Sequence, residues 1–124
     1  MSYQPQFKVK ATYMRGGTSK GTFFNIADLP KEAQEDTKKR DKLLQRIVGS
    51  PDVYKQQMDG MGGATSSTSK AILVGKSSVA NHDVDYYFCQ VAIDKDFVDM
   101  SGNCGNLSSA VGPFAIYEGL VDNV

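Results

Sequence analysis

The sequence predicts an α+β domain in which a mixed or antiparallel sheet curls around a central helix. Two observations support this prediction. Stretches with strand-like alternation are separated by one charged helical stretch, and an almost wholly apolar helical segment begins at Leu107. An apolar helix must be covered on most sides, and the predicted strands are the elements that can cover it. The length of 124 residues fits one globular domain.

Two strands separated by a glycine-rich loop are expected at the start of the chain. Residues 7–13 alternate apolar and polar side chains, and residues 22–26 again have the composition of a strand. Residues 15–21 between them contain three glycines. This composition predicts a loop in which the backbone is open to a ligand.

One amphipathic surface helix is expected over residues 28–48. Asp28 and Pro30 suit its first turn, charged residues occupy much of its length, and Gly49 suits its end. Directly afterwards, the pair Ser50 and Pro51 predicts a second, short helical start.

The second half of the chain predicts a loop, a hairpin and a buried helix. Residues 57–70 are mostly small or flexible and predict a polar loop outside the core. Residues 71–74 and 84–93 predict two paired strands, joined by a turn with His82 at the surface. In the apolar helix after Leu107, Pro113 removes a backbone hydrogen bond and predicts a kink or a shortened helix.

Composition excludes several classes of partner. Fourteen basic and fourteen acidic residues balance, so no broad field attracts nucleic acid or an anionic membrane. No apolar run approaches the roughly twenty residues of a membrane helix, which favours a soluble, cytoplasmic protein. The two cysteines, Cys89 and Cys104, lack metal-ligand spacing and are interpreted as reduced thiols.

Cys104 stands in a glycine-rich segment directly before the apolar helix. Backbone N–H groups at a helix start favour a thiolate and can also bind a carboxylate. The flanking glycines let a ligand approach the backbone closely. The alternative is a buried structural thiol beside a glycine turn. For Cys89, in the middle of an apolar strand, the structural interpretation is favoured.

Lys70 follows a run of hydroxyl side chains and begins a predicted strand. A lysine at a sheet rim can pair with a substrate carboxylate or, when desolvated, lose its charge and act as a base. The alternatives are a solvated lysine at a strand end and a merely flexible loop over residues 66–69.

The glycine-rich loop over residues 15–21 is not a nucleotide site. It lacks the G-x-x-x-x-G-K-[ST] order and precedes a strand instead of a helix. Its donors nevertheless suit a carboxylate. Arg15 could bind one with two hydrogen bonds, and Thr18 or Ser19 could add a hydroxyl.

Three motifs in this order resemble the PrpF family. They are Met-Arg-Gly-Gly-Thr-Ser-Lys-Gly at residues 14–21, Asp-Gly-Met-Gly-Gly with Ser-Thr-Ser-Lys at residues 59–63 and 67–70, and Ser-Gly-Asn-Cys-Gly-Asn at residues 101–106. The family comprises 2-methylaconitate cis–trans isomerases of the methylcitrate cycle, which serves propionate catabolism, and related isomerases and tautomerases of unsaturated tricarboxylates. The resemblance covers essentially all of the chain.

The resemblance implies a fold like that of diaminopimelate epimerase. In that fold two similar domains each wrap a sheet around a central helix, and the active site lies between them. Residues 1–124 would be the N-terminal portion of the first domain, and the second domain would lie outside this chain. The need of the apolar helix for additional cover agrees with this expectation.

The resemblance also implies the roles of individual residues. Lys70 would transfer the proton, and Cys104 would be its partner across the substrate as acid, base or positioning group. The expected substrate-binding residues are Arg15, Gly17, Thr18, Ser19, Ser67, Thr68, Ser69, Asn103, Gly105 and Asn106. The reaction would need neither a metal nor an organic cofactor.

Three functional hypotheses follow. The first is a 2-methylaconitate cis–trans isomerase, expected to be a cytoplasmic homo-oligomer such as a dimer. The second is a related reaction on methylitaconate, oxalomesaconate or aconitate. The third is a non-catalytic accessory or binding module for an aconitase-like dehydratase, the functional partner that the family resemblance implies. The 124 residues by themselves are expected to be inactive.

Overall fold

A five-stranded mixed sheet forms the centre of the computed structural model, which describes residues 8–121. The strands are β1 (Thr12–Gly16), β2 (Ser19–Asn25), β3 (Lys70–Lys76), β4 (Val84–Val91) and β5 (Val98–Asp99). They lie in chain order across the sheet. Neighbours are antiparallel except β2 and β3, which run parallel. The expected α+β class with a mixed sheet is thereby confirmed.

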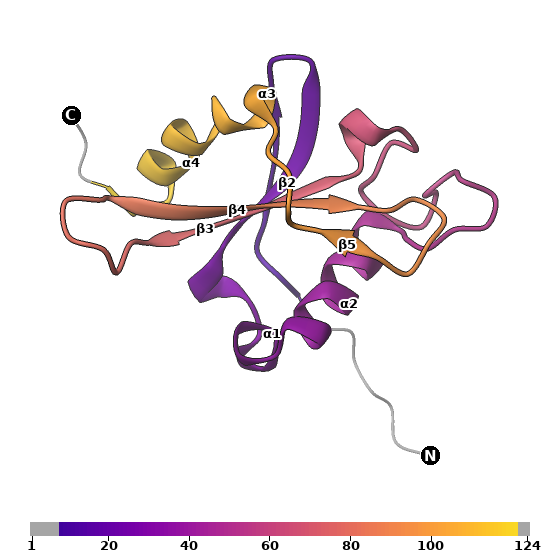
Figure 1. The fold of residues 1–124 in the computed structure, drawn as a ribbon, viewed down its shortest axis with the longest axis horizontal. Coiled ribbons are helices and arrows are strands. Elements are labelled where there is room, and N and C mark those ends of the chain that lie inside the picture. Colours follow the sequence, from indigo (N-terminus) through magenta and orange to yellow (C-terminus); the bar gives the residue numbers. More distant parts are fainter. Residues whose placement is uncertain (1–7, 122–124) are drawn as a thin grey trace.

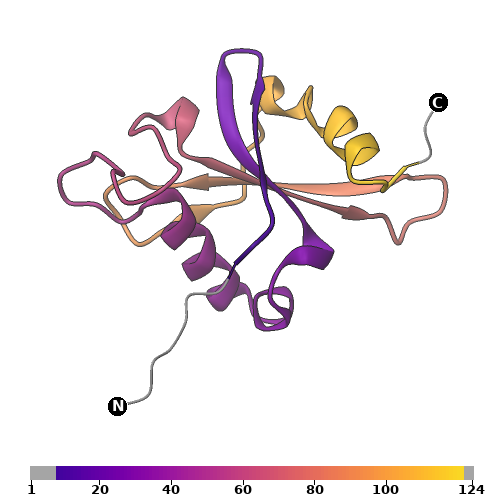
Figure 2. The same cartoon turned by 180° about the vertical axis from the view of Figure 1, so that it is seen from behind.

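Helices cover both faces of this sheet (Figures 1 and 2). Helices α1 (Lys31–Glu35) and α2 (Thr37–Val48) lie on one face, and α3 (Gly105–Ser108) and α4 (Val111–Tyr117) lie on the other. Each face has its own apolar cluster, because successive strand residues point to opposite sides. Phe23 packs in the cluster with α4, whereas its neighbour Phe24 packs in the cluster with α2.

The first strand begins later than the sequence predicted. Of the expected strand over residues 7–13, Phe7 lies outside the described residues, and pairing with β2 starts at Thr12. The strand continues through Gly16, so the expected seven-residue loop shrinks to a tight turn at Gly17 and Thr18. The alternation of side chains could not predict this shift, because the pairing of β1 with β2 continues into the glycine-rich segment.

The predicted surface helix is two helices. Asp36 ends α1 and begins α2, since its side chain accepts hydrogen bonds from the backbone N–H groups of Lys38 and Lys39. The apolar side of α2 buries Leu44 and Val48 against the sheet, as the amphipathic pattern predicted. The end at Gly49 is also confirmed, because this residue adopts a left-handed conformation (φ 95°).

The helical start predicted at Ser50 and Pro51 is wrong. The chain instead turns around Asp52, whose carboxylate accepts hydrogen bonds from the backbone N–H groups of Tyr54, Gln56 and Gln57. A carboxylate that takes these donors offers the backbone an alternative to helical hydrogen bonds.

The predicted hairpin of β3 and β4 is confirmed, with a register that runs from Lys70 opposite Gln90 to Lys76 opposite Val84. His82 is exposed in the connecting turn, as expected. Strand β4 ends at Val91 and not at residue 93. The short strand β5 was not predicted, because two residues are too few to show alternation.

The predicted apolar helix is divided into α3 and α4. The break lies at Ser109 and Ala110, and Pro113 falls in the first turn of α4, where a proline ring is tolerated. A shortened helix was the expected effect of Pro113. The helix is not enclosed by the sheet, however. Phe114 is buried against the sheet, whereas 75% of Tyr117 is exposed.

Candidate active site

Lys70, Cys104 and Ser19 form a compact cluster on the sheet face that carries α3. Lys70 Nζ lies 3.1 Å from Ser19 Oγ and 3.2 Å from Cys104 Sγ, and donates a hydrogen bond to each. Cys104 Sγ and Ser19 Oγ are 3.6 Å apart. All three side chains are buried, and 9% of Lys70 remains exposed. The sequence had singled out all three residues as site residues.

The topology explains why these residues meet. Ser19 is the first residue of β2 and Lys70 the first of β3. Because these strands are parallel and adjacent, their starts lie at the same edge of the sheet. Cys104 lies at the helix start, as the sequence predicted, and is the N-cap of α3, where its Sγ accepts a hydrogen bond from Leu107 N over 3.4 Å. The cap fixes the sulfur above the two strand ends.

The surroundings stabilise a thiolate at Cys104. Burial raises the pKa of this thiol. Hydrogen bonds from the Leu107 backbone N–H, the Ser19 hydroxyl and Lys70, together with the Lys70 charge, lower it by more. The pKa of Cys104 therefore lies below its ordinary value. Helix α3 has four residues, so the N–H group of Leu107 acts as a single local donor and not through an extended macrodipole.

Cys89 is a different kind of thiol. It lies on the opposite face of the sheet, fully buried in the cluster with α2. Burial raises its pKa to about 12. A thiol that stays protonated at neutral pH is a poor nucleophile, so the structural interpretation of Cys89 is confirmed.

Strand β4 supplies a wall to the site. Lys70 Nζ lies 5.8 Å from the ring centroid of Phe88, within the range of a cation–π contact. Tyr86, two residues earlier on the same side of the strand, donates a hydrogen bond from its hydroxyl to Asn103 Oδ1 over 3.1 Å. This bond holds the segment before Cys104 against the sheet.

The tip of the first hairpin packs directly on α3. Asn106 Nδ2 donates a hydrogen bond to Thr18 Oγ1 over 2.9 Å. A Cβ added to Gly16 would lie 2.3 Å from the Asn106 carbonyl oxygen, and one added to Gly17 would lie 2.3 Å from Asn106 Oδ1. Glycine at these positions therefore permits the close contact that brings Ser19 to Cys104.

The backbone beside Cys104 is open. Asn103, Gly105 and Asn106 are all exposed, and a Cβ added to Gly105 would have no heavy atom within 4 Å among residues 8–121. Of the expected substrate-binding residues, these three therefore border the cluster together with Gly17 and Thr18.

The hydroxyl side chains of residues 66–69 stabilise the fold more than the sequence suggested. Ser69 is fully buried, donates to the Val91 carbonyl and accepts from Gln57 Nε2. Thr68 closes a capping box with Thr65, and Ser67 Oγ lies 3.2 Å from the Thr65 hydroxyl. The expectation that Ser69 contacts substrate is therefore corrected, because its hydrogen bonds are used inside the fold. Ser67 and Thr68 remain partly exposed.

Arg15 is not brought to the cluster. It pairs across the hairpin with Lys20, so the two side chains share one face of the sheet. Ser19, adjacent to Lys20 in the strand, points to the opposite face. The expectation that Arg15 binds the same carboxylate as Ser19 is therefore corrected by the register of the hairpin.

Gln57 was missed because the segment around it appeared too polar for the core. Its side chain is buried, with Nε2 donating to Ser50 Oγ and Ser69 Oγ and with Oε1 accepting from the Ala64 backbone N–H. These bonds tie the loop over residues 57–64 to Ser69, directly before β3. Phe88 was also missed as a site residue, because only the register of β4 places it near Lys70.

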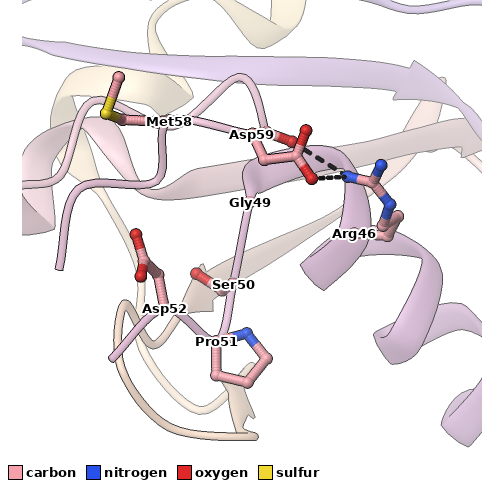
Figure 3. A pocket seen from close by; sticks show the side chains of 7 residues that line it. All are labelled: Arg46, Gly49, Ser50, Pro51, Asp52, Met58 and Asp59. Carbon is pink, nitrogen blue, oxygen red and sulfur yellow. Dashed lines mark hydrogen bonds and ion pairs between the residues drawn. The ribbon is translucent and has the colours of Figure 1, made fainter. Parts of the chain in front are cut away.

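A separate hollow lies where α2 meets the following loop (Figure 3). Its lining consists of Arg46, Gly49, Ser50, Pro51, Asp52, Met58 and Asp59. Arg46 points across to Asp59, with Nη1 to Oδ2 at 3.2 Å. None of the residues expected to bind substrate lines this hollow, so we place no ligand in it.

The part of the chain that the structure describes contains no helix long and apolar enough to cross a bilayer. Within the same residues, no group of three or more His, Cys, Asp or Glu side chains is placed to hold a metal ion.

The fold of this chain matches that of an isomerase of known structure. The crystal structure of methylitaconate-delta-isomerase superposes with a TM-score of 0.84 at 49% sequence identity, over 94% of this chain and 28% of that one. The PrpF protein family matches residues 6–124. The chain belongs to the PrpF family.

Two relatives are named 2-methyl-aconitate isomerase. The protein from Shewanella oneidensis is 66% identical over 97% of this chain and 30% of its own length. The protein from Cupriavidus necator is 63% identical over 98% of this chain and 31% of its own length. The chain thus spans about a third of the length of these relatives.

Proposed function

We propose that this chain is the N-terminal portion of the first domain of a cofactor-independent isomerase that moves a proton on an unsaturated tricarboxylate. The most favoured activity is that of a 2-methylaconitate cis–trans isomerase of the methylcitrate cycle. One observation carries the proposal: a buried Lys70 amino group lies 3.2 Å from the sulfur of Cys104, whose pKa is lowered by its surroundings. Such a pair can take and return a proton.

Lys70 and Cys104 divide the proton transfer between them. One of the two groups removes a proton from the carbon next to the conjugated double bond, and the negative charge spreads into a carboxylate. Rotation within this delocalised intermediate is followed by return of a proton, which gives the other geometric isomer. A lysine charge and preorganised N–H donors stabilise the enolate-like state.

The open backbone beside Cys104 supports a carboxylate-binding role for its neighbours. Asn103, Gly105 and Asn106 are exposed next to the buried sulfur. The hydroxyl of Ser19 reaches the same point from the hairpin. We assign one substrate carboxylate to these donors, because a carboxylate accepts several N–H and O–H bonds at once.

A double-bond migration on the same site is the second candidate. A relative named 3-methylitaconate isomerase, from Eubacterium barkeri, is 49% identical, and one named (4E)-oxalomesaconate Delta-isomerase, from Novosphingobium, is 52% identical. The first proton removal would be shared, and the proton would return to a different carbon. Identities of 66% and 63% favour the 2-methylaconitate reaction.

The remaining expectations belong to the same proposal. The whole protein is expected to act in the cytoplasm as a homo-oligomer, such as a dimer, with an aconitase-like dehydratase as its functional partner. A second domain outside these 124 residues is expected to supply the opposite wall of the site, so the fragment alone is expected to be inactive.

Proton NMR in heavy water tests the proposal. Full-length protein, its Lys70→Ala variant and a matched Lys76→Ala variant are each given 2-methylaconitate, trans-aconitate and methylitaconate. We expect isomerisation with deuterium entering the substrate, and a loss on the order of 10²- to 10⁴-fold in Lys70→Ala only. Lys76 lies in the same strand and is exposed, so its variant controls for the loss of a lysine.

Two outcomes would contradict the proposal. Full activity in Lys70→Ala would remove Lys70 from the reaction. No conversion of any of the three acids by folded full-length protein would favour an accessory or binding module.

A further inference from the structure

Lys70 Nζ is the nucleophile nearest to Cys104 Sγ among the described residues, and the two atoms are already in contact. They are 3.2 Å apart and both side chains are 9% exposed. Ser19 Oγ completes a triangle with them, 3.1 Å from the nitrogen and 3.6 Å from the sulfur. A flexible lysine chain needs a shift of only an ångström or two to reach bonding distance.

Cys104 is chemically the reactive thiol of this chain. Hydrogen bonds from Leu107 N and Ser19, and the Lys70 charge, lower its pKa despite burial, whereas burial raises the pKa of Cys89 to about 12. Oxidation by peroxide follows thiolate character and access. The exposed backbone of Gly105 beside Cys104 leaves room for a molecule as small as hydrogen peroxide.

A disulfide within this part of the chain cannot protect Cys104. The sheet separates the two thiols, because Cys104 packs in the cluster with α4 and Cys89 in the cluster with α2. Among residues 8–121, the nearest group able to attack the oxidised sulfur is therefore the amine of Lys70 and not a second thiol.

We propose that Lys70 and Cys104 form a reversible oxidative modification site, in which hydrogen peroxide converts the pair into an S–N cross-link. The Cys104 thiolate first attacks peroxide. The O–O bond breaks, the sulfur is oxidised by two electrons to a sulfenic acid, and hydroxide leaves. That hydroxide takes a proton from the Lys70 ammonium and becomes water. The amine so formed attacks the sulfur, the S–N bond forms, the S–O bond breaks, and a second amine proton leaves with the departing hydroxide as water.

The cross-link is reversible by thiols. An external thiol attacks Cys104 Sγ, the S–N bond breaks, and the nitrogen takes the thiol proton, which leaves a mixed disulfide on Cys104. A second thiol molecule then releases the free cysteine by exchange. While the link exists, the thiolate and the basic amine are both tied up in the S–N bond, so the site is switched off, yet the sulfur is protected from irreversible oxidation to sulfinic acid.

Mass spectrometry of the full-length protein tests this inference without any substrate. The protein is treated with about one equivalent of hydrogen peroxide, digested and mapped. We expect a peptide containing Lys70 joined to one containing Cys104, with a mass about 2 Da below the sum of the reduced peptides, and its loss on addition of dithiothreitol. The peptide carrying Cys89 should remain unmodified and serves as the internal control.

A Lys70→Arg variant provides the matched comparison. It keeps a positive charge beside the sulfur but replaces the amine with a guanidinium, which is a much weaker nucleophile. We expect peroxide to leave the sulfenic acid on Cys104, trapped by dimedone at a level on the order of ten-fold above that of the unaltered protein. A Lys76→Arg variant should behave as the unaltered protein does.

Three results would overturn the inference. Cys104 could fail to react with peroxide, it could proceed to sulfinic acid with no link to Lys70, or the link could retain an oxygen atom between nitrogen and sulfur. The mapping of the unaltered protein decides among these even if the Lys70→Arg variant does not fold. Since no substrate is involved, a wrong assignment of the isomerase reaction would not affect the result.

Discussion

The Ser19 hydroxyl lies 3.1 Å from Lys70 Nζ, although the two residues are 51 positions apart in the chain. Both stand at the first position of a strand, and the two strands are parallel neighbours in the sheet. The contact links the glycine-rich hairpin to the lysine of the candidate site, and Cys104 Sγ completes the cluster.

Removing this hydroxyl should weaken the site without disturbing the fold. In Ser19→Ala, Lys70 and Cys104 both lose a hydrogen-bond partner, so we expect kcat/KM of the full-length protein to fall by a factor on the order of 10. Isomerisation assays with a Ser78→Ala control, in the exposed turn between β3 and β4, check the effect. Equal activity of the two variants would contradict a role for Ser19.

Lys70 should control the ionisation of Cys104. Its hydrogen bond and its charge both lower the pKa of this thiol, so Lys70→Met should raise it. The pH midpoint of alkylation by iodoacetamide, followed on the Cys104 peptide, should therefore move to higher pH. Lys76→Met, in the same strand, should leave the midpoint where it is. A midpoint unaffected by Lys70→Met would mean that the lysine does not stabilise the thiolate.

Gly16 should be essential for the contact between the hairpin and α3. A Cβ at this position would lie 2.3 Å from the backbone oxygen of Asn106, which cannot move as a side chain can. We expect Gly16→Ala to lower the free energy of unfolding by about 1–3 kcal/mol. Gly112→Ala is the control, because a Cβ there meets nothing within 4 Å in the described part of the chain. Urea denaturation of the two variants compares them, and equal midpoints would refute the close contact.

Gln57 should stabilise the loop that leads into β3. In Gln57→Ala, the Ala64 N–H group and the Ser50 and Ser69 hydroxyls lose a buried partner. We expect a loss of about 1–3 kcal/mol in the free energy of unfolding. Gln56→Ala removes the neighbouring exposed side chain and should cost little. Thermal and urea denaturation measure both, and a Gln57→Ala variant as stable as Gln56→Ala would show that the buried amide is dispensable.

Local patterns in the sequence were enough to predict the elements in which buried and exposed residues alternate regularly. The strands β3 and β4, the turn with His82 and the end of α2 at Gly49 were predicted, because alternation and glycine report on neighbouring residues. Lys70 and Cys104 were also singled out as candidate site residues, since each stands among small residues where a strand or helix starts. The order of three motifs sufficed to recognise the PrpF family, which residues 6–124 match.

The tertiary structure decided which of these residues meet. The parallel pairing of β2 and β3 brings Ser19 to Lys70, and the register of the hairpin turns Arg15 to the other face. The pairing of β3 with β4 brings Ser69 to the Val91 carbonyl, and Gln57 donates to the same hydroxyl, so that the hydroxyl serves the fold. Strand pairing joins residues that are far apart in the chain, and moving a register by one residue exchanges the faces of the sheet. Neither relation leaves a trace in local composition, which is why the sequence named the residues of the site but not their arrangement.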